Sequence, residues 1–444
     1  MTNAVLSREM QTSRTMTDRL TIMAWSVVIG AVSGLACAGV RLAFRLLQWI
    51  FVQHAGLLPE AAAGLTPMRR LLTPVLGAAC ATAVLWAVRR CSKTGAGRAE
   101  EYIEAVRAEH GDIPFVATFW RTVSSAFSVA TGAAIGREGS MIQFAAAASS
   151  WIGKRTPLKS VSLARQVAYG AAAAVAAAYQ APIAGIFFAT EIVLGNWAWS
   201  EAPQLALAST AGWLVSRAVL GEDALFAVHD VLLVSWQTAL WTVPLALAMG
   251  ITGPMYQALL RSLRFARSLP LALVWSGLLV GALSLLRPEV WGNGDVALSH
   301  LLTGEPILSG IVLILVLRIL ATTFCVGTGT VGGVFTPTLF AGAAIGLAAG
   351  QILHFPHPVL FAIVGLSALL ATTTHAPVMA ALMAVELTGQ WHLLPLLLIL
   401  NLAAFRLARS ISPHSLYAVN TPNPSQRDRH PRSQAHVGNL IVSR

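Results

Sequence analysis

Long apolar runs dominate the pattern of hydrophobic and polar positions along this chain of 444 residues. Four of them cover residues 20–52, 71–88, 240–260 and 307–326. A helix needs about 20 mostly apolar residues to cross the hydrocarbon core of a bilayer, and each run is close to that length or longer. The pattern therefore predicts an all-α polytopic membrane protein.

The overall composition agrees with this interpretation. Apolar residues make up 56% of the chain and charged residues 11%, which is less than half the charged fraction usual in soluble domains. The first apolar run is too long for a cleaved secretory signal and lacks an Ala-x-Ala-type cleavage site, so we interpret it as a retained span. The four cysteines show no paired spacing, and we expect neither a metal site nor a disulfide framework.

The net charge of +11 lies mostly outside the apolar runs. Basic residues gather in the two terminal segments, at Arg8, Arg14, Arg19, Arg427, Arg429, Arg432 and Arg444. By the positive-inside bias we expect both termini in the cytoplasm, which requires an even number of full crossings of the membrane. Because the basic residues flank spans without interleaved aromatic residues, no nucleic-acid partner is expected.

Glycine and proline clusters interrupt the apolar runs at membrane depth, at residues 132–139, 181–185, 327–337 and 375–377. A helix that breaks in contact with lipid would leave backbone hydrogen-bonding groups unpaired. Broken helices of this kind usually line a polar cavity. The sequence therefore predicts a transport pathway between discontinuous helices.

The two halves of the chain resemble each other at these breaks. Residues 131–140 resemble residues 328–337, and 181–191 resemble 376–386, in the same order and at nearly the same spacing. Such duplication is typical of transporters whose substrate site lies near the membrane midplane. We expect a tail at 1–20, repeats at 21–220 and 221–410, and a final segment at 411–444 with a disordered basic tail. The residues alone do not tell parallel repeats from inverted ones.

The first candidate site is Gly136-Arg137-Glu138-Gly139-Ser140, which opens a predicted helix. Open amides at a helix N-terminus attract anions. Glu138 can bind these amides itself, as a tethered anion that competes with the transported one. The alternative is a capping acid paired with Arg137. A charge inside a membrane span is costly and normally functional, which favours the first interpretation.

The second candidate site, Gly332 to Pro337, repeats this device without a charged side chain. Pro337 suits the first turn of a helix. Two uncharged amide clusters would bind chloride without holding it too tightly to conduct. The alternative is that the glycines of this motif only allow two helices to pack closely. A third break at residues 95–97 precedes a charged stretch, 100–112, that we interpret as a solvated helix.

Two further features receive structural interpretations. Glu191 and Glu386 end the two Ala-Pro segments, and we expect them to form hydrogen bonds between helices or to lie where the helices reach water. Gly292-Asn293-Gly294 is predicted to be a turn without a phosphate-binding role, because the following residues lack the required lysine.

These motifs resemble those of the CLC family of chloride channels and proton-coupled transporters. Residues 136–140 resemble the GREGP signature, 333–337 resemble GxFxP, 95–97 stand in the place of GSGIP, and Leu416-Tyr417 resembles the C-terminal tyrosine. All four follow the family order. Residues 291–294 and 373–377 look most like the bacterial ClcB subgroup.

The resemblance implies the CLC fold with two inverted repeats, a homodimer with one pore in each subunit, and no cofactor. Glu138 would be the external gating glutamate. The anion-binding set would comprise Gly136, Arg137, Gly139, Gly333, Val334, Phe335 and Tyr417, faced by the loop Gly95, Ala96 and Gly97. The amides of Val334 and Phe335 and the Tyr417 hydroxyl would hold the central chloride, and the amides near Glu138 would serve an outer site.

Two departures from the family pattern bear on function. Ala96 stands where the family usually has an anion-coordinating serine. Ile192 stands where proton-coupled members have an inner glutamate, and an isoleucine cannot relay a proton. Glu191, one position away, would point to another helix face. We therefore expect passive chloride conduction or loosely coupled exchange. The resemblance to the ClcB subgroup implies an electrical shunt during proton pumping in acid resistance.

Other functions remain as alternatives. A chloride/proton antiporter would use the same anion site, whereas a fluoride exporter is disfavoured by Tyr417. An intramembrane enzyme is not expected, because the chain lacks Gly-x-Ser-x-Gly and His-Glu-x-x-His arrangements. A cation carrier would need paired carboxylates near the membrane midplane. The helix breaks of this chain present backbone amides there instead, so a cation carrier is not expected.

Overall fold

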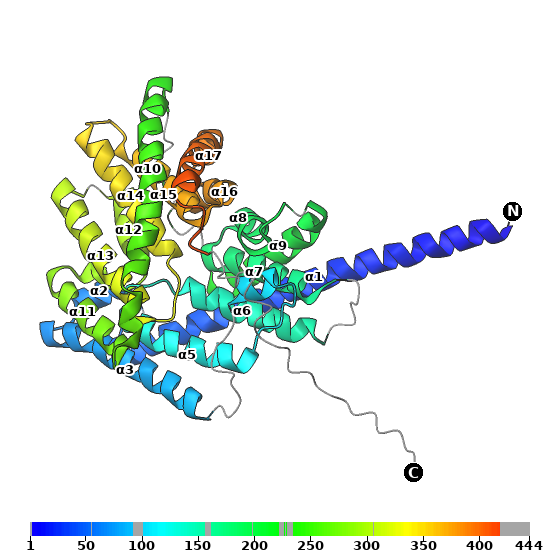
Figure 1. Ribbon diagram of the computed structural model, residues 1–444, viewed down its shortest axis with the longest axis horizontal. Helices are drawn as coiled ribbons and strands as arrows, with labels where there is room; N and C mark the ends of the chain where they lie inside the picture. The colour runs from blue at the N-terminus through cyan, green and yellow to red at the C-terminus, as the bar shows by residue number, and fades with distance from the viewer. Residues whose placement is uncertain are drawn as a thin grey trace, which may run out of the picture.

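The computed structural model describes residues 2–54, 56–91, 101–155, 161–197, 199–221, 226, 228, 234–304 and 306–417, with only the backbone described for 2–17 and 91. Within these ranges all regular secondary structure is helical, and one isolated β-bridge joins Gly136 to Gly333. The all-α prediction is confirmed. In Figure 1, α6 to α9 lie together on one side of the molecule and α10 to α15 on the other, with α16 beside α8.

The described residues of the first half form nine α-helices and two other helical turns. They are α1 (Thr2–Val52), α2 (Leu58–Ala63), α3 (Pro67–Cys91), α4 (Tyr102–Arg107), α5 (Phe115–Ala130), α6 (Glu138–Gly153), α7 (Leu163–Tyr179), α8 (Pro182–Phe188), the π-helical η1 (Ala189–Leu194), η2 (Trp199–Glu201) and α9 (Ala202–Leu220).

The second half forms the remaining helices among the described residues. They are α10 (Trp236–Ser262), η3 (Arg264–Ser268), α11 (Ala272–Leu286), η4 (Pro288–Val290), α12 (Asp295–Thr303), α13 (Leu308–Thr328), α14 (Phe335–Ile352), α15 (Pro358–Thr374), α16 (Pro377–Thr388), η5 (Trp391–Leu393) and α17 (Leu394–Ile411).

Six of the described helical segments are long and apolar enough to cross a membrane. They are Asp18–Val52, Pro67–Arg90, Trp236–Ser268, Leu308–Thr328, Phe335–Ile352 and Trp391–Ile411. The four predicted runs coincide with α1, α3, α10 and α13. Large apolar side chains such as Trp236 and Ile399 lie exposed, as expected for a protein surrounded by lipid.

The helix breaks recur in the two halves with the same backbone conformation. Gly132 follows α5 with φ +113°, and Gly329 follows α13 with φ +85°. This left-handed region is costly for residues with a Cβ, which explains glycine at both places. Gln180 and His375 likewise end α7 and α15 with φ of 55° and 59°, each just before an Ala-Pro pair. Both duplicated motifs therefore form the same turn twice.

Two glutamates join the halves through reciprocal helix caps. The Glu386 carboxylate, near the C-terminal end of α16, accepts hydrogen bonds from the amides of Ile183 and Ala184 at the start of α8, at 2.9 and 2.6 Å. Glu191, just after α8, accepts hydrogen bonds from two amides at the start of α16, at 3.4 and 2.8 Å. Each carboxylate lies at the positive end of a helix dipole. The predicted hydrogen bonds between helices are confirmed.

This exchange shows that α8 and α16 run antiparallel, because the end of each helix reaches the start of the other. The helices α8 and α16 occupy corresponding places in the two repeats, and an inverted repeat requires such helices to run in opposite directions. The structure therefore favours inverted repeats over parallel ones. The repeat boundaries at 21–220 and 221–410 stay a prediction.

The two terminal segments and the charged stretch 100–112 differ in how far they can be described. The backbone of the expected tail is helical from Thr2 and continuous with the first span of α1. The stretch 100–112 is not the solvated helix that we expected, because only Tyr102–Arg107 is helical and four of these six residues are buried. This helix, α4, packs against α7 and η1. The expected disordered tail after Tyr417 lies outside the described residues.

Candidate anion site

The two glycine motifs meet at the starts of α6 and α14. The Gly136 amide donates to the Gly333 carbonyl at 2.6 Å, and the Gly333 amide donates to the Gly136 carbonyl at 2.7 Å. The close contact of the two loops requires glycine at position 139, because a Cβ on Gly139 would lie 2.6 Å from the Gly333 nitrogen. The fold thus brings the two candidate motifs together, and their role in anion binding stays a prediction.

Several amides at these helix starts have no backbone acceptor. The first N–H groups of any α-helix lack an intrahelical partner. In the described part of the chain, no backbone carbonyl accepts from the amides of Glu138 and Gly139 at the start of α6, or of Val334 and Phe335 at the start of α14. These donors carry no formal charge. The amides of Gly139, Val334 and Phe335 are open to an anion, whereas the Glu138 amide faces its own carboxylate.

The amides of Gly136 and Gly333 are paired with each other, and these two hydrogen bonds join the two loops. The expected contribution of both residues to anion binding stays a prediction. Pro337 lies in the first turn of α14, as predicted.

Glu138 is the first residue of α6, and it is only 5% exposed. Its Oε1 accepts a hydrogen bond from Nδ2 of Asn293 at 2.6 Å. Its Oε2 is buried without a hydrogen-bond partner and lies against Gly136, where an added Cβ would be 2.5 Å away. A buried carboxylate oxygen without a partner is costly, and such a group needs a functional explanation.

A tight ion pair with Arg137 does not account for Glu138. The Nε of Arg137 is 3.9 Å from Oε1 of Glu138, beyond hydrogen-bond distance. The same guanidinium instead approaches Asp295, with Nη2 and Oδ2 3.4 Å apart. The ion pair of Glu138 with Arg137 is therefore long, and Arg137 is shared with Asp295.

Tyr417 comes to the site from the C-terminal segment. This segment is anchored by the amide of Leu416, which donates to the carbonyl of Thr373 near the end of α15 at 2.8 Å. The Tyr417 phenol is half-buried and lies within electrostatic range of Glu101, Glu138 and Tyr102. Tyr417 and Glu138 thus lie in one region, although 279 positions separate them in the sequence.

Sequence reasoning missed a second tyrosine here. The ring of Tyr179 in α7 lies 4.9 Å from that of Phe335, and its hydroxyl lies 3.4 Å from that of Thr336. It also interacts electrostatically with Glu138 and Tyr417. Its place at the C-terminal end of α7, just before the 181–185 break, is the signal that could have revealed it.

The remaining sequence candidates lie elsewhere or cannot be described. Gly95, Ala96 and Gly97 lie outside the described residues, so the effect of Ala96 stays a prediction. Ile192, in η1, is 1% exposed, and its carbonyl accepts from Nη2 of Arg107 at 2.7 Å. Its neighbour Glu191 points toward α16. The two adjacent positions therefore have different surroundings, as predicted.

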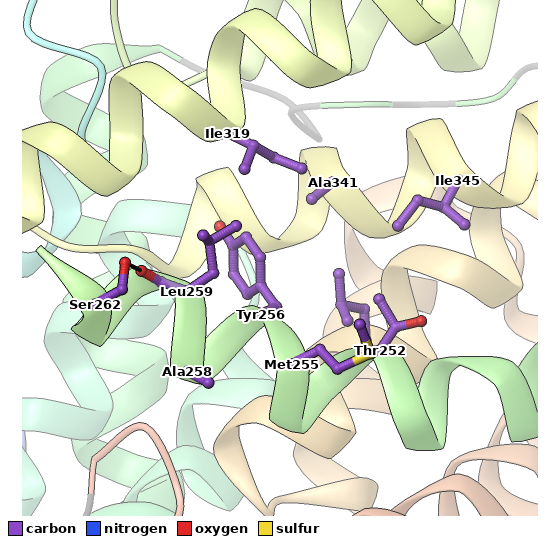
Figure 2. Close-up of a pocket in the computed structure, with 10 residues that line it drawn as sticks. Thr252, Met255, Tyr256, Ala258, Leu259, Ser262, Ile319, Ala341 and Ile345 are labelled. Carbon is purple, nitrogen blue, oxygen red and sulfur yellow. Dashed lines mark hydrogen bonds between the residues drawn. The ribbon is translucent and has the colours of Figure 1, made fainter.

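A separate crevice lies between α10 and the helices α13, α14 and α15. It has a volume of about 580 Å³ and is lined mainly by apolar side chains, among them Met255, Ile319 and Ile345 (Figure 2). No residue of the glycine motifs lines it. It offers no amide cluster to an anion and is distinct from the site at the start of α6.

Comparisons with known proteins agree with the motifs. Residues 79–409 match a family described as voltage gated chloride channel. The chain is 37% identical over 410 residues to the voltage-gated ClC-type chloride channel ClcB of Citrobacter koseri, which covers 89% of this chain and 98% of that relative. It is 38% identical over 406 residues to ClcB of Salmonella typhimurium, covering 88% of this chain and 97% of the relative.

Solved structures show the same fold. A slow cyanobacterial Cl⁻/H⁺ antiporter has a TM-score of 0.78 at 23% identity, and a CLC-type fluoride/proton antiporter has a TM-score of 0.74 at 21% identity. Each covers 89% of this chain and 96% of the other. Members of this family are ion channels and transporters, not enzymes. The chain belongs to the CLC family of voltage-gated chloride channels.

Proposed function

We propose that this protein is a chloride channel of the bacterial inner membrane, gated by Glu138. One observation carries the proposal: the buried Glu138 carboxylate lies at the start of α6, where that helix meets the open amides of α14. A carboxylate in this place competes with a mobile anion for the same donors. Protonation removes its charge and frees them.

The anion would be held by groups without formal charge. The amides of Val334 and Phe335 are open at the start of α14, and the Tyr417 phenol belongs to the same electrostatic cluster as Glu138. Neutral donors bind chloride weakly enough for it to leave, which a channel requires. The amides of Arg137, Glu138 and Gly139 would serve an outer position once the carboxylate has moved.

Two observations favour a channel over a chloride/proton antiporter. Ile192, at the position where coupled members have a glutamate, is a fully buried alkyl group. The neighbouring Glu191 is engaged in capping α16. The relatives ClcB are named as channels, and the antiporters among the structural neighbours are too distant in sequence to decide the mechanism. A passive chloride conductance would dissipate the voltage built by proton pumping, which is the role we propose in acid resistance.

The test is chloride flux from purified protein in liposomes, with chloride and pH followed together. The liposomes hold an outward chloride gradient, and a cation ionophore lets a counter-ion move to balance the charge. Under these conditions we expect chloride efflux with little or no uphill proton movement. The Glu138→Gln variant and protein-free liposomes serve as controls. Strong uphill proton transport that Glu138→Gln abolishes would support the antiporter instead.

We also propose that the protein is a homodimer with independent pores. Exposed apolar side chains on α9 and α17, including Leu214 and Ile399, give a surface that a second copy could cover. The mass of the complex in mild detergent should correspond to two subunits. A stable and fully active monomer would contradict this proposal. Both termini are expected in the cytoplasm, as the basic residues predict.

A further inference from the structure

The turn between η4 and α12 lies against the Glu138 carboxylate. Its central residue, Asn293, is buried and donates the 2.6 Å hydrogen bond to Oε1. Among the described residues, no other side chain donates a hydrogen bond to this carboxylate, since Oε2 has no partner and Arg137 stays 3.9 Å away. Hydrogen bonds to an ionised acceptor are short and about twice as strong as neutral ones.

The surrounding atoms orient the Asn293 amide. Its Oδ1 accepts a hydrogen bond from the Asp295 amide at 3.3 Å, which leaves Nδ2 directed at Glu138. Gly292 and Gly294 flank it with φ of +79° and +100°, a conformation that turns the backbone sharply on both sides. An NH₂ group donates and does not accept, so this contact favours the ionised carboxylate over the protonated one.

A buried arginine holds the turn in place. Arg318 of α13 is 1% exposed and donates to the carbonyls of Glu289 at 2.7 Å, Val290 at 3.2 Å and Gly292 at 2.9 Å. The amide of Gly292 donates to the carbonyl of Gly132 at 3.1 Å, which ties the turn to the loop before α6. Burying a guanidinium is costly unless its donors are used. Three backbone carbonyls accept from Nη1 and Nη2 of Arg318, while its buried Nε has no hydrogen-bond partner.

We propose that Asn293 is a latch that holds ionised Glu138 in its blocking position, and that Arg318 is a positioning residue that sets the latch. The inference rests on the proposed gating role of Glu138. It assigns a function to the Gly-Asn-Gly turn, which the sequence marked only as a turn. The latch sets how readily the gate releases, and therefore the pH at which chloride flux begins.

Other charged or titratable groups also face Glu138. They are Arg137 beside it, Asp295 of α12, Tyr179 of α7 and Tyr417 of the C-terminal segment. Substitutions at Asn293 leave all four in place. A change in pH response in such variants therefore reports the lost amide contact.

The experiment measures chloride flux from liposomes as a function of external pH for Asn293→Leu and Asn293→Asp. Loss of the donor in Asn293→Leu is expected to move the midpoint of flux to higher pH by about one unit. The isosteric Asn293→Asp places a second carboxyl group against Glu138, so the two share a proton and the midpoint moves further in the same direction. Arg318→Lys, which cannot reach three carbonyls at once, is expected to shift it less.

A matched control is Asn401→Leu, because Asn401 of α17 is also buried and donates from Nδ2, but to Ser367 and the Pro377 carbonyl. The pH midpoint of chloride flux through Asn401→Leu should equal that of the wild type. Each Asn293 variant is also combined with Glu138→Gln, where no shift should remain. Midpoints that stay unchanged in both Asn293 variants would overturn the latch alone, whereas a Glu138→Gln protein that keeps the wild-type pH response would overturn the gate.

Discussion

Chloride flux through a Glu138→Gln variant is expected to be high at neutral pH and nearly independent of external pH. Glutamine has the size of the protonated glutamic acid but cannot carry its negative charge, so it no longer competes for the open amides at α6 and α14. In the wild type, flux should rise as external pH falls, by up to about tenfold for each unit where a single carboxylate controls it. Liposome flux at several external pH values checks both curves.

Glu60→Gln is the matched control, because Glu60 is an exposed carboxylate in the first turn of α2. It should keep the wild-type flux and pH response. A folded Glu138→Gln protein whose pH response matches the wild type would remove Glu138 from the gate.

Replacing Gly139 by valine is expected to abolish chloride flux and to destabilise the protein by about 1–3 kcal/mol, the usual cost of overpacking. An added Cβ would lie 2.6 Å from the nitrogen and 2.7 Å from the Cα of Gly333. These are backbone atoms, so the two loops must separate and the hydrogen bonds between Gly136 and Gly333 must break. Thermal unfolding in detergent and liposome flux together measure the effect.

Gly39→Ala provides the comparison for this substitution. Gly39 lies within α1, and a Cβ there would meet no atom within 4 Å. Alanine should leave flux unchanged and should not lower stability, since it favours a helix more than glycine does. A Gly139→Val protein with wild-type flux and unfolding temperature would show that the contact of the two loops is not needed.

Much of this architecture could be predicted because the same local chemistry occurs twice. The long apolar runs predicted α1, α3, α10 and α13, and the duplicated glycine motifs predicted two helix starts that share one site. Antiparallel repeats could not be derived from the residues, because a one-dimensional repeat has no direction in space. The reciprocal caps of Glu191 and Glu386 decide the direction.

The residues around the gate were harder to predict because distant segments supply them. Asn293 is far from Glu138 in sequence, and Gly-Asn-Gly has the composition of any tight turn. Arg318 lies within an apolar span, where nothing local indicates which carbonyls it will bind. Tyr102 was assigned to a solvated segment because charged neighbours concealed its buried face. Local patterns identify a helix start, but only the folded chain shows what is placed against it.

The exchange of caps between α8 and α16 also bears on how such a chain could have arisen. Each glutamate satisfies amides in the opposite half, so the two contacts are copies related by a two-fold axis. Two separate chains of half this length, inserted in opposite orientations, would make the same self-complementary contact as an isologous dimer. Gene fusion would then have preserved an interface that already existed. Loss of either glutamate after the fusion would leave the helix amides of the opposite half without their cap.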